Sequence, residues 1–166
     1  DLVEVTTELT AQMLILGGLA DTMEVGRAKV LTAWSSGAAH AEFMAMVQRQ
    51  GGQWLESRAE YDALPHNVVT ASSSGGVLDV DARRLARAVI HAGGGRHVET
   101  DGIDHATGVE FVVGVGQDVR KGDPIATVVG RTDRQVHTLI KGVEESVEIA
   151  DVDGVQKMPM ILDTWT

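Results

Sequence analysis

In Val113-Gly-Val-Gly-Gln-Asp-Val-Arg-Lys-Gly-Asp-Pro-Ile125, strand and turn signals follow one another within thirteen residues. The glycines after the first valine predict that one strand ends and that a turn carrying Asp118 begins. A short strand centred on Val119 comes next. Lys121-Gly-Asp-Pro124 predicts a second tight turn, because proline and glycine supply the backbone angles that such turns need. Residues 125–129 are apolar and rich in valine, which predicts another strand.

This pattern resembles the barrel-sandwich domains that carry biotin or lipoate on a lysine at an exposed hairpin tip. Lys157-Met158 is superficially similar to the Met-Lys-Met of biotin carriers, but Gln156 replaces the first methionine and Pro159 follows. These departures disfavour a covalent carrier role for Lys157, which stays as the weakest of three functional hypotheses.

The rest of the second half alternates between short strands and helices. Asp81 is placed to cap a helix with Leu85, Ala86, Val89 and Ile90 as its buried stripe, ended by Gly93-Gly-Gly95. A flexible turn, Ser72-Ser-Ser-Gly-Gly76, separates the first two strands. The expected strands are residues 67–71, 76–80, 108–113, 125–129 and 158–162, with a last helix at 133–145. This order predicts a small α+β, mostly antiparallel domain that begins after a boundary near residues 51–66.

The first sixty residues are expected to be helical. Apolar residues repeat at helical spacing in the first helix, with polar residues on its other side, and Gly17-Gly18 ends it. The apolar set is Leu2, Val5, Leu9, Met13 and Leu16, and the polar set is Glu4, Thr7, Glu8 and Gln12. Asp21 and Glu24 resemble a capping box for a second helix that passes through Trp34 and ends near Gly37. A third helix, residues 38–50, is expected to turn Phe43, Met46 and Val47 inward, with Gly51-Gly52 beyond it.

Composition excludes several kinds of function. The 166 residues include 14 basic and 24 acidic side chains, so a net charge of −10 argues against a nucleic-acid partner. The absence of cysteine excludes disulfides, thiol nucleophiles and thiolate metal sites, and it suits a cytoplasmic protein. No apolar run is long enough to cross a bilayer, so no membrane partner is expected. The chain begins with Asp1, which suggests processing or a longer polypeptide.

Candidate chemistry is sparse. Gly93-Gly-Gly-Arg96 could cradle a phosphate through backbone N–H groups, but it follows a helix, whose negative end would face the anion. A helix cap and tight chain reversal is the preferred interpretation. The six histidines, among them His91, His97 and His105, lack metal-site spacing. Asp101-Gly-Ile-Asp104 lacks the calcium-loop pattern and is interpreted as a turn or hydrogen-bond anchor. No serine lies in a nucleophile elbow.

Five motifs occur in one order along the chain. They are Leu9–Leu16; Gly37–Phe43 with Met46-Val47 and Gln50–Gly52; Arg83–Arg96, which ends in Gly-Gly-Gly-Arg; Asp101-x-Ile-Asp104 with Gly108; and Val119-x-x-Gly-Asp-Pro-Ile125. Together they resemble the C-terminal part of the thymidine phosphorylase and pyrimidine-nucleoside phosphorylase family, about the last third of its length. Ala38 departs from the family, where lysine is usual.

The resemblance implies an α+β arrangement in which residues 1–60 are the helical tail of the catalytic α/β domain. Residues 66–166 would be the C-terminal α+β domain, of the barrel-sandwich or hammerhead-like type. It also implies a homodimeric parent enzyme that converts thymidine and phosphate to thymine and 2-deoxyribose 1-phosphate. Phosphate is then a co-substrate, and no cofactor is expected.

In that family the nucleoside and phosphate bind to motifs upstream of this stretch, so no catalytic, substrate-binding, phosphate-binding or metal residue is assigned here. This chain would be structural and inactive alone, with the remainder of the phosphorylase chain as its partner. The alternative is a free-standing module that binds a small ligand or a partner through its barrel-like half.

Overall fold

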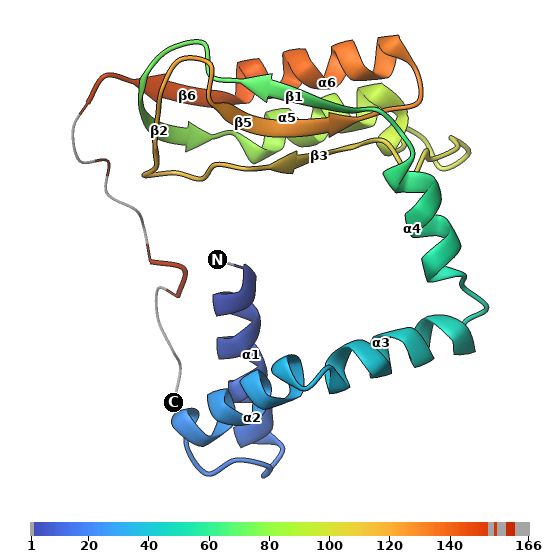
Figure 1. The fold of residues 1–166 in the computed structure, drawn as a ribbon, viewed down its shortest axis with the longest axis vertical. Helices are drawn as coiled ribbons and strands as arrows, with labels where there is room; N and C mark the ends of the chain where they lie inside the picture. Colours follow the sequence, from blue (N-terminus) through green and yellow to red (C-terminus); the bar gives the residue numbers. More distant parts are fainter. Residues whose placement is uncertain (1, 153–154, 156–158, 162–166) are drawn as a thin grey trace. The chain divides into compact units, whose positions relative to one another are not determined.

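A computed structural model describes residues 2–152, 155 and 159–161 and divides the chain into two compact units, which meet between Ser57 and Arg58. Residues 2–57 are mainly helical, and residues 58–152 combine helices with short antiparallel strands (Figure 1). The chain is therefore of mixed α and β structure, as expected.

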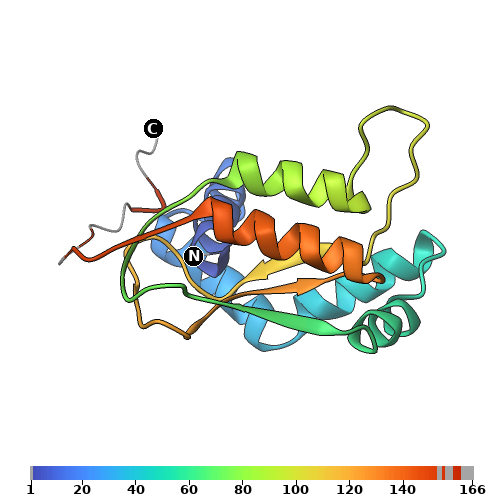
Figure 2. The ribbon, with the colours of Figure 1, turned by 90° about the horizontal axis from the view of Figure 1, so that it is seen from above.

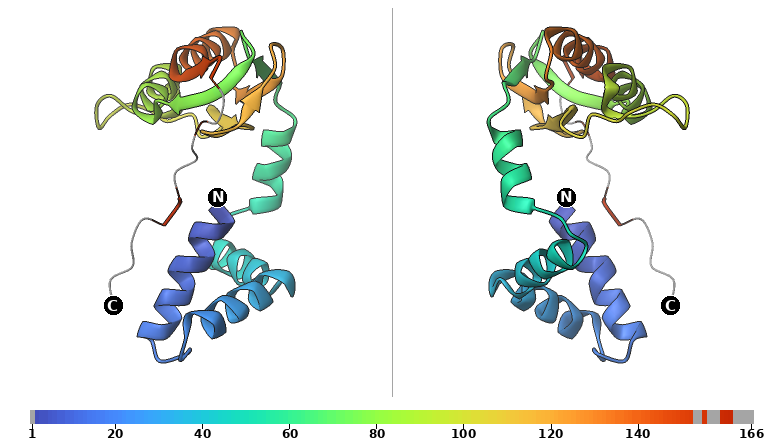
Figure 3. Two further views of the ribbon diagram at one scale, coloured as in Figure 1. Left: turned by 90° about the vertical axis from the view of Figure 1, so that its left-hand side faces the viewer. Right: turned by 90° about the vertical axis from the view of Figure 1, so that its right-hand side faces the viewer.

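Three helices and the start of a fourth make up the first unit. They are α1 (Leu2–Leu16), α2 (Met23–Ser35), α3 (Ala38–Arg49) and α4 (Trp54–Asp62). The expected ends of the first two helices are confirmed, and Figure 3 shows the chain reversing between α1 and α2. The expected cap of α2 is wrong, because Thr22 and not Asp21 accepts the hydrogen bond from the Val25 N–H, at 3.3 Å. A threonine one residue later thus caps the helix in the same way, by satisfying a free N–H group of the first turn.

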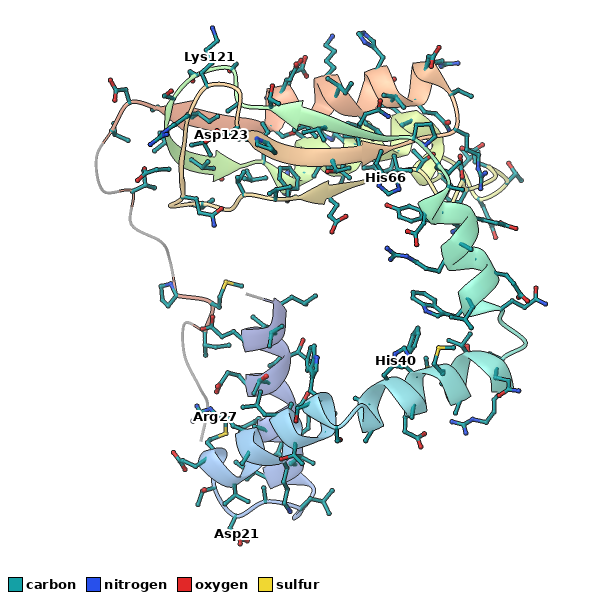
Figure 4. All side chains as sticks on the ribbon, viewed as in Figure 1. Asp21, Arg27, His40, His66, Lys121 and Asp123 are labelled. Atoms are coloured by element: carbon teal, nitrogen blue, oxygen red, sulfur yellow. The ribbon has the colours of Figure 1, made fainter. Side chains whose placement is uncertain are left out.

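Helix α1 packs on α2 through its small and polar side. Thr7 and Ala11 are buried, and a side chain at Gly26 of α2 would come within 3.0 Å of the Ala11 Cβ. Arg27 of α2 (Figure 4) donates to both carboxylate oxygens of Glu8, at 2.6 and 2.8 Å, which adds a two-pronged ion pair to this interface.

The predicted apolar stripe of α1 lies on the opposite side and is exposed. Leu9 is 58% exposed, Met13 69% and Leu16 80%. A contiguous exposed apolar surface of this kind is typical of an interaction site.

One expectation for the third helix is wrong. Met46 of α3 is 43% exposed instead of turned inward, whereas Phe43 and Val47 are half-buried. Phe43 makes an edge-on contact with Trp54 of α4, with 5.0 Å between ring centroids. Helix α4 itself falls in the expected boundary region. Its sequence carries little helical periodicity, and an i,i+4 ion pair between Arg58 and Asp62 supports it locally.

Two three-stranded antiparallel sheets make up the second unit. One has the order β1-β5-β3, and the other has the order β4-β2-β6. The strands are β1 (His66–Thr70), β2 (Gly75–Val80), β3 (Gly108–Phe111), β4 (Asp118–Val119), β5 (Pro124–Val129) and β6 (Val147–Ala150). The expected strand at 158–162 lies partly outside the described residues, and residues 159–161 are not in a strand. The last described strand is instead β6, which pairs with β2.

Helices α5 (Ala82–Val89) and α6 (Asp133–Ser146) lie side by side over the strands (Figure 2). Asp81 caps α5 as expected, accepting from the Arg84 N–H at 2.9 Å. Ala88 rather than Ala86 is the buried alanine of α5, since it faces α6. Both sheets and both helices share one core, whose largest fully buried side chains are Val77, Val128, Leu139 and Val143.

The two helices approach closely because Gly142 of α6 has no side chain. A Cβ added at Gly142 would lie 2.3 Å from the Cβ of Ala88. This contact fixes how near α5 can lie to α6, and hence how both helices cover the core.

We expect Gly142→Ala to lower the free energy of unfolding by about 1–2 kcal/mol, because overpacking costs more than the improved helix propensity returns. Urea unfolding measures the loss. Ala88→Gly in the same chain should restore part of it, since the double variant removes the overlap. Lys141→Ala is the matched control, because this neighbouring side chain is 67% exposed. Equal losses for the variants at 141 and 142 would contradict this account of the helix contact.

Candidate functional site

The glycine run lies where the chain leaves α5 and turns toward β3. After Val89 the helix widens into a π turn, η1 (Ile90–Gly94), and Gly93 adopts φ +94°, a left-handed conformation that favours glycine. A Cβ at Gly94 would lie 2.5 Å from the Thr107 carbonyl oxygen, so the next residue must also be small. The glycines therefore make the chain reversal that the sequence suggested.

Asp104 holds this reversal in place. Its main-chain N–H donates to the Gly93 carbonyl at 2.8 Å. Its carboxylate accepts hydrogen bonds from the Ala106 N–H, the Thr107 hydroxyl, Gln135 Nε2 and Arg131 Nε, at 2.9–3.2 Å. Asp104 thus joins the glycine run, through its main chain, to the start of β3 and the N-terminus of α6, through its half-buried carboxylate. We call this set, Gly93, Asp104, Thr107, Arg131 and Gln135, the Asp104 clasp.

The clasp lowers the pKa of Asp104. Partial burial is the largest single influence and raises the pKa, but the four hydrogen bonds together outweigh it. Asp104 is therefore an ionised anchor at neutral pH and is poorly suited to general acid catalysis.

The loop between the glycine run and Asp104 contains a second carboxylate that is held by hydrogen bonds. Asp101 accepts hydrogen bonds from the main-chain N–H groups of Val98 and His97, at 3.1 and 3.0 Å, and these bonds lower its pKa. The same loop brings His97 beside His91, with 5.1 Å between ring centroids. No local pattern predicts this pairing, because the two histidines lie on either side of the glycines.

The other candidate residues do not converge. Ser74 accepts a hydrogen bond from the Lys121 N–H at 2.9 Å, so part of the serine turn is used to hold the Lys121–Pro124 turn. Figure 4 shows Lys121 at the end of this turn, pointing away from the strands. Lys157 lies outside the described residues. Within the described part of the chain, no three histidine or carboxylate side chains are grouped to hold a metal ion.

Shallow grooves in both units open to solvent. A groove of about 470 Å³ lies between α3 and α4 and includes Met44, Gln48 and Trp54. Another, of about 440 Å³, lies beside β4 and includes Asp118 and Asp123. Neither groove contains the Asp104 clasp.

Arg131 and Gln135 were not identified from the sequence. Gln135 had a detectable signal, because Thr132-x-x-Gln135 is a capping box, and the structure forms both of its hydrogen bonds. The contact with Asp104 spans 27 residues for Arg131 and 31 for Gln135, so no local pattern reveals it.

We expect Asp104→Asn to lower the free energy of unfolding at pH 7 by about 1.5–3 kcal/mol, the range for hydrogen bonds to a charged group. Because the folded pKa is lowered, this contribution is present above the unfolded pKa of about 3.9 and is lost as the pH falls through the folded value. The stability gap between the two proteins should therefore shrink below about pH 4. Asp21→Asn, at an exposed loop position, is the control. Its free energy of unfolding should stay within about 0.5 kcal/mol of the wild-type value both at pH 7 and below pH 4. A gap independent of pH would contradict the ionic role of Asp104.

Comparison with known proteins connects this architecture to a family. The model of the pyrimidine nucleoside phosphorylase C-terminal domain matches residues 77–150, which contain the clasp and both helices of the second unit. Over 132 residues the chain is 39% identical to thymidine phosphorylase of Burkholderia lata, covering 77% of this chain and 30% of that protein. Over 152 residues it is 33% identical to thymidine phosphorylase of Agrobacterium fabrum, covering 89% of this chain and 35% of that protein.

The chain thus spans about a third of the length of these curated relatives. Among the described residues, no helix is both long and apolar enough to cross a membrane. The expected resemblance is confirmed: the chain belongs to the thymidine and pyrimidine-nucleoside phosphorylase family and corresponds to its C-terminal part.

Proposed function

We propose that this chain is the C-terminal scaffold of a pyrimidine-nucleoside phosphorylase. The parent reaction is the reversible conversion of thymidine and phosphate to thymine and 2-deoxyribose 1-phosphate. The observation that carries this proposal is the match of residues 77–150 to the family's C-terminal domain. Residues 66–166 would form that domain, of barrel-sandwich or hammerhead-like type, and residues 1–60 would be the helical tail of the catalytic α/β domain.

The described residues support a structural role for this chain and a catalytic role for the preceding part of a phosphorylase. Catalysis of phosphorolysis must place a phosphate dianion against the anomeric carbon and stabilise charge on the departing base. The carboxylates with lowered pKa here are engaged by main-chain or side-chain donors that fix local structure. The nucleoside and phosphate would therefore bind to the preceding part of a phosphorylase chain, and this chain alone would be inactive.

The exposed stripe of α1 supports the same view. The first unit buries only small or medium side chains, namely Thr7, Ala11, Ala20 and Val30, while the large side chains of the stripe remain in water. We infer that the stripe docks onto the remaining two thirds of a phosphorylase chain, because the curated relatives are about three times longer than this one. Full burial of each such side chain contributes about 1.5–3 kcal/mol.

The parent enzyme would be a cytoplasmic homodimer that needs phosphate as co-substrate and no cofactor. The lack of cysteine fits a reducing compartment. The barrel-like half would serve as support and would move with the catalytic lobe during cleft closure.

A chimera tests the proposed function. The chain replaces the matching part of the Burkholderia lata thymidine phosphorylase, and thymine release from thymidine and phosphate is measured. We expect the chimera to be active, within about a hundredfold of the natural relative, because a slightly misplaced scaffold costs about that factor. The 166-residue chain alone should release no thymine. Activity in the isolated chain, or a folded chimera without activity, would refute the proposal.

The isolated chain should self-associate through the α1 stripe, since large exposed apolar surfaces are covered by association when their natural partner is missing. Light scattering after size-exclusion chromatography should give a mass that rises with concentration. Leu9→Gln, Met13→Gln and Leu16→Gln together should bring it close to the monomer mass. Val98→Gln is the control, because Val98 is similarly exposed, at 57%, in the second unit. A monomeric wild-type chain at high concentration would count against docking by the stripe.

A further inference from the structure

The chain reversal at the glycine run places two imidazoles together on the surface. His91 lies in η1 and His97 lies beyond the glycines, and both are exposed. Their ring centroids are 5.1 Å apart and their planes are inclined by 34°. From these positions we propose that His91 and His97 form a binding site for a divalent transition-metal ion of the zinc, nickel or copper type. This proposal does not depend on the proposed phosphorylase function.

The separation of the rings suits a shared ion. A zinc ion bonds to an imidazole nitrogen at about 2.0–2.1 Å, which places it roughly 3 Å from the ring centroid. Two imidazoles bound at a tetrahedral angle then have centroids roughly 5 Å apart, which is the spacing of this pair. Two nitrogen ligands from the protein leave the remaining coordination positions to water, so the site is open.

The main chain that carries the two histidines is held at both ends of the reversal. Gly93 fixes the reversal after His91, because its main-chain carbonyl is bound by the Asp104 N–H at 2.8 Å. On the other side, the Asp101 carboxylate accepts the main-chain N–H of His97 at 3.0 Å. The main chain on both sides of the pair is therefore ordered before the ion arrives, which lowers the entropic cost of binding.

Charge around the pair favours a cation. Asp101 interacts electrostatically with His97, and Glu99 lies in the same loop. Arg96 opposes this attraction, but its guanidinium donates to the Glu99 carbonyl at 3.5 Å. Imidazole–imidazole packing alone gives little reason for the pair, because both rings are exposed and would repel each other when protonated. Neutral imidazole is the form that binds zinc, nickel and copper.

Bound metal would fasten the loop over residues 96–107 to the end of α5. Figure 2 shows this yellow loop extending beyond the ends of α5 and α6. The Asp104 clasp anchors the loop where it joins β3, and the ion would anchor it again near its start. Metal binding would thus stiffen this loop and raise thermal stability.

Isothermal titration of the 166-residue chain with zinc chloride at pH 7.5 tests the site. We expect one ion per chain, with affinity at least tenfold weaker in His91→Ala and in His97→Ala. His40→Ala is the matched control, because His40 is an exposed histidine on α3 (Figure 4), and its affinity should equal that of wild type. Far-UV circular dichroism checks that each variant is folded.

A thermal melt gives a second readout. Zinc should raise the melting temperature of wild type and of His40→Ala, and it should not raise that of the variants at 91 or 97. The proposal is overturned if wild type binds no zinc, if either variant at the pair binds as tightly as wild type, or if His40→Ala weakens binding equally.

Discussion

Burial of β5 on both faces is the constraint on which the second unit depends. Ile125, Ala126, Val128 and Val129 are all at most 3% exposed, although β5 belongs to a sheet of only three strands. A strand buried in this way needs β1 and β3 to satisfy its main-chain groups and other elements to cover its faces. Helix α6 provides part of this cover through Leu139 and Val143, and α5 can reach the same core only because Gly142 lets it lie close.

Features with a local cause could be predicted from the sequence. The valine-rich run of β5, the Asp81 cap and the glycine reversal each follow from one short segment, and the structure contains all three. Features that depend on residues far away in the sequence could not be predicted in this way. The burial of Ala88 in place of Ala86 is set by α6, and strand β6 is defined by pairing with β2, so neither has a sufficient signal in its own sequence.

The clasp illustrates the same limit at the candidate site. The sequence suggested that the Asp101–Asp104 segment anchors a turn, which the hydrogen bonds of both carboxylates confirm. The sequence did not reveal that Asp104 also binds α6. Arg131 and Gln135 come close to Asp104 only in the folded chain, where α6 follows β5. For α1, the helical period was right, but which side packs on α2 was set by Gly26 and the Glu8–Arg27 pair instead of by hydrophobicity.

The two units differ in how much of their large apolar side chains each buries. The second unit contains every one of the largest fully buried side chains of the described residues, and its loops are fixed by internal hydrogen bonds. The first unit leaves Leu9, Met13 and Leu16 in water, while its buried side chains among the described residues are small or medium in size, so hydrophobic burial alone gives it little stability. In the function proposed above, the second unit would keep its own geometry, and the exposed stripe of the first unit would supply the apolar surface that joins it to the rest of a phosphorylase chain.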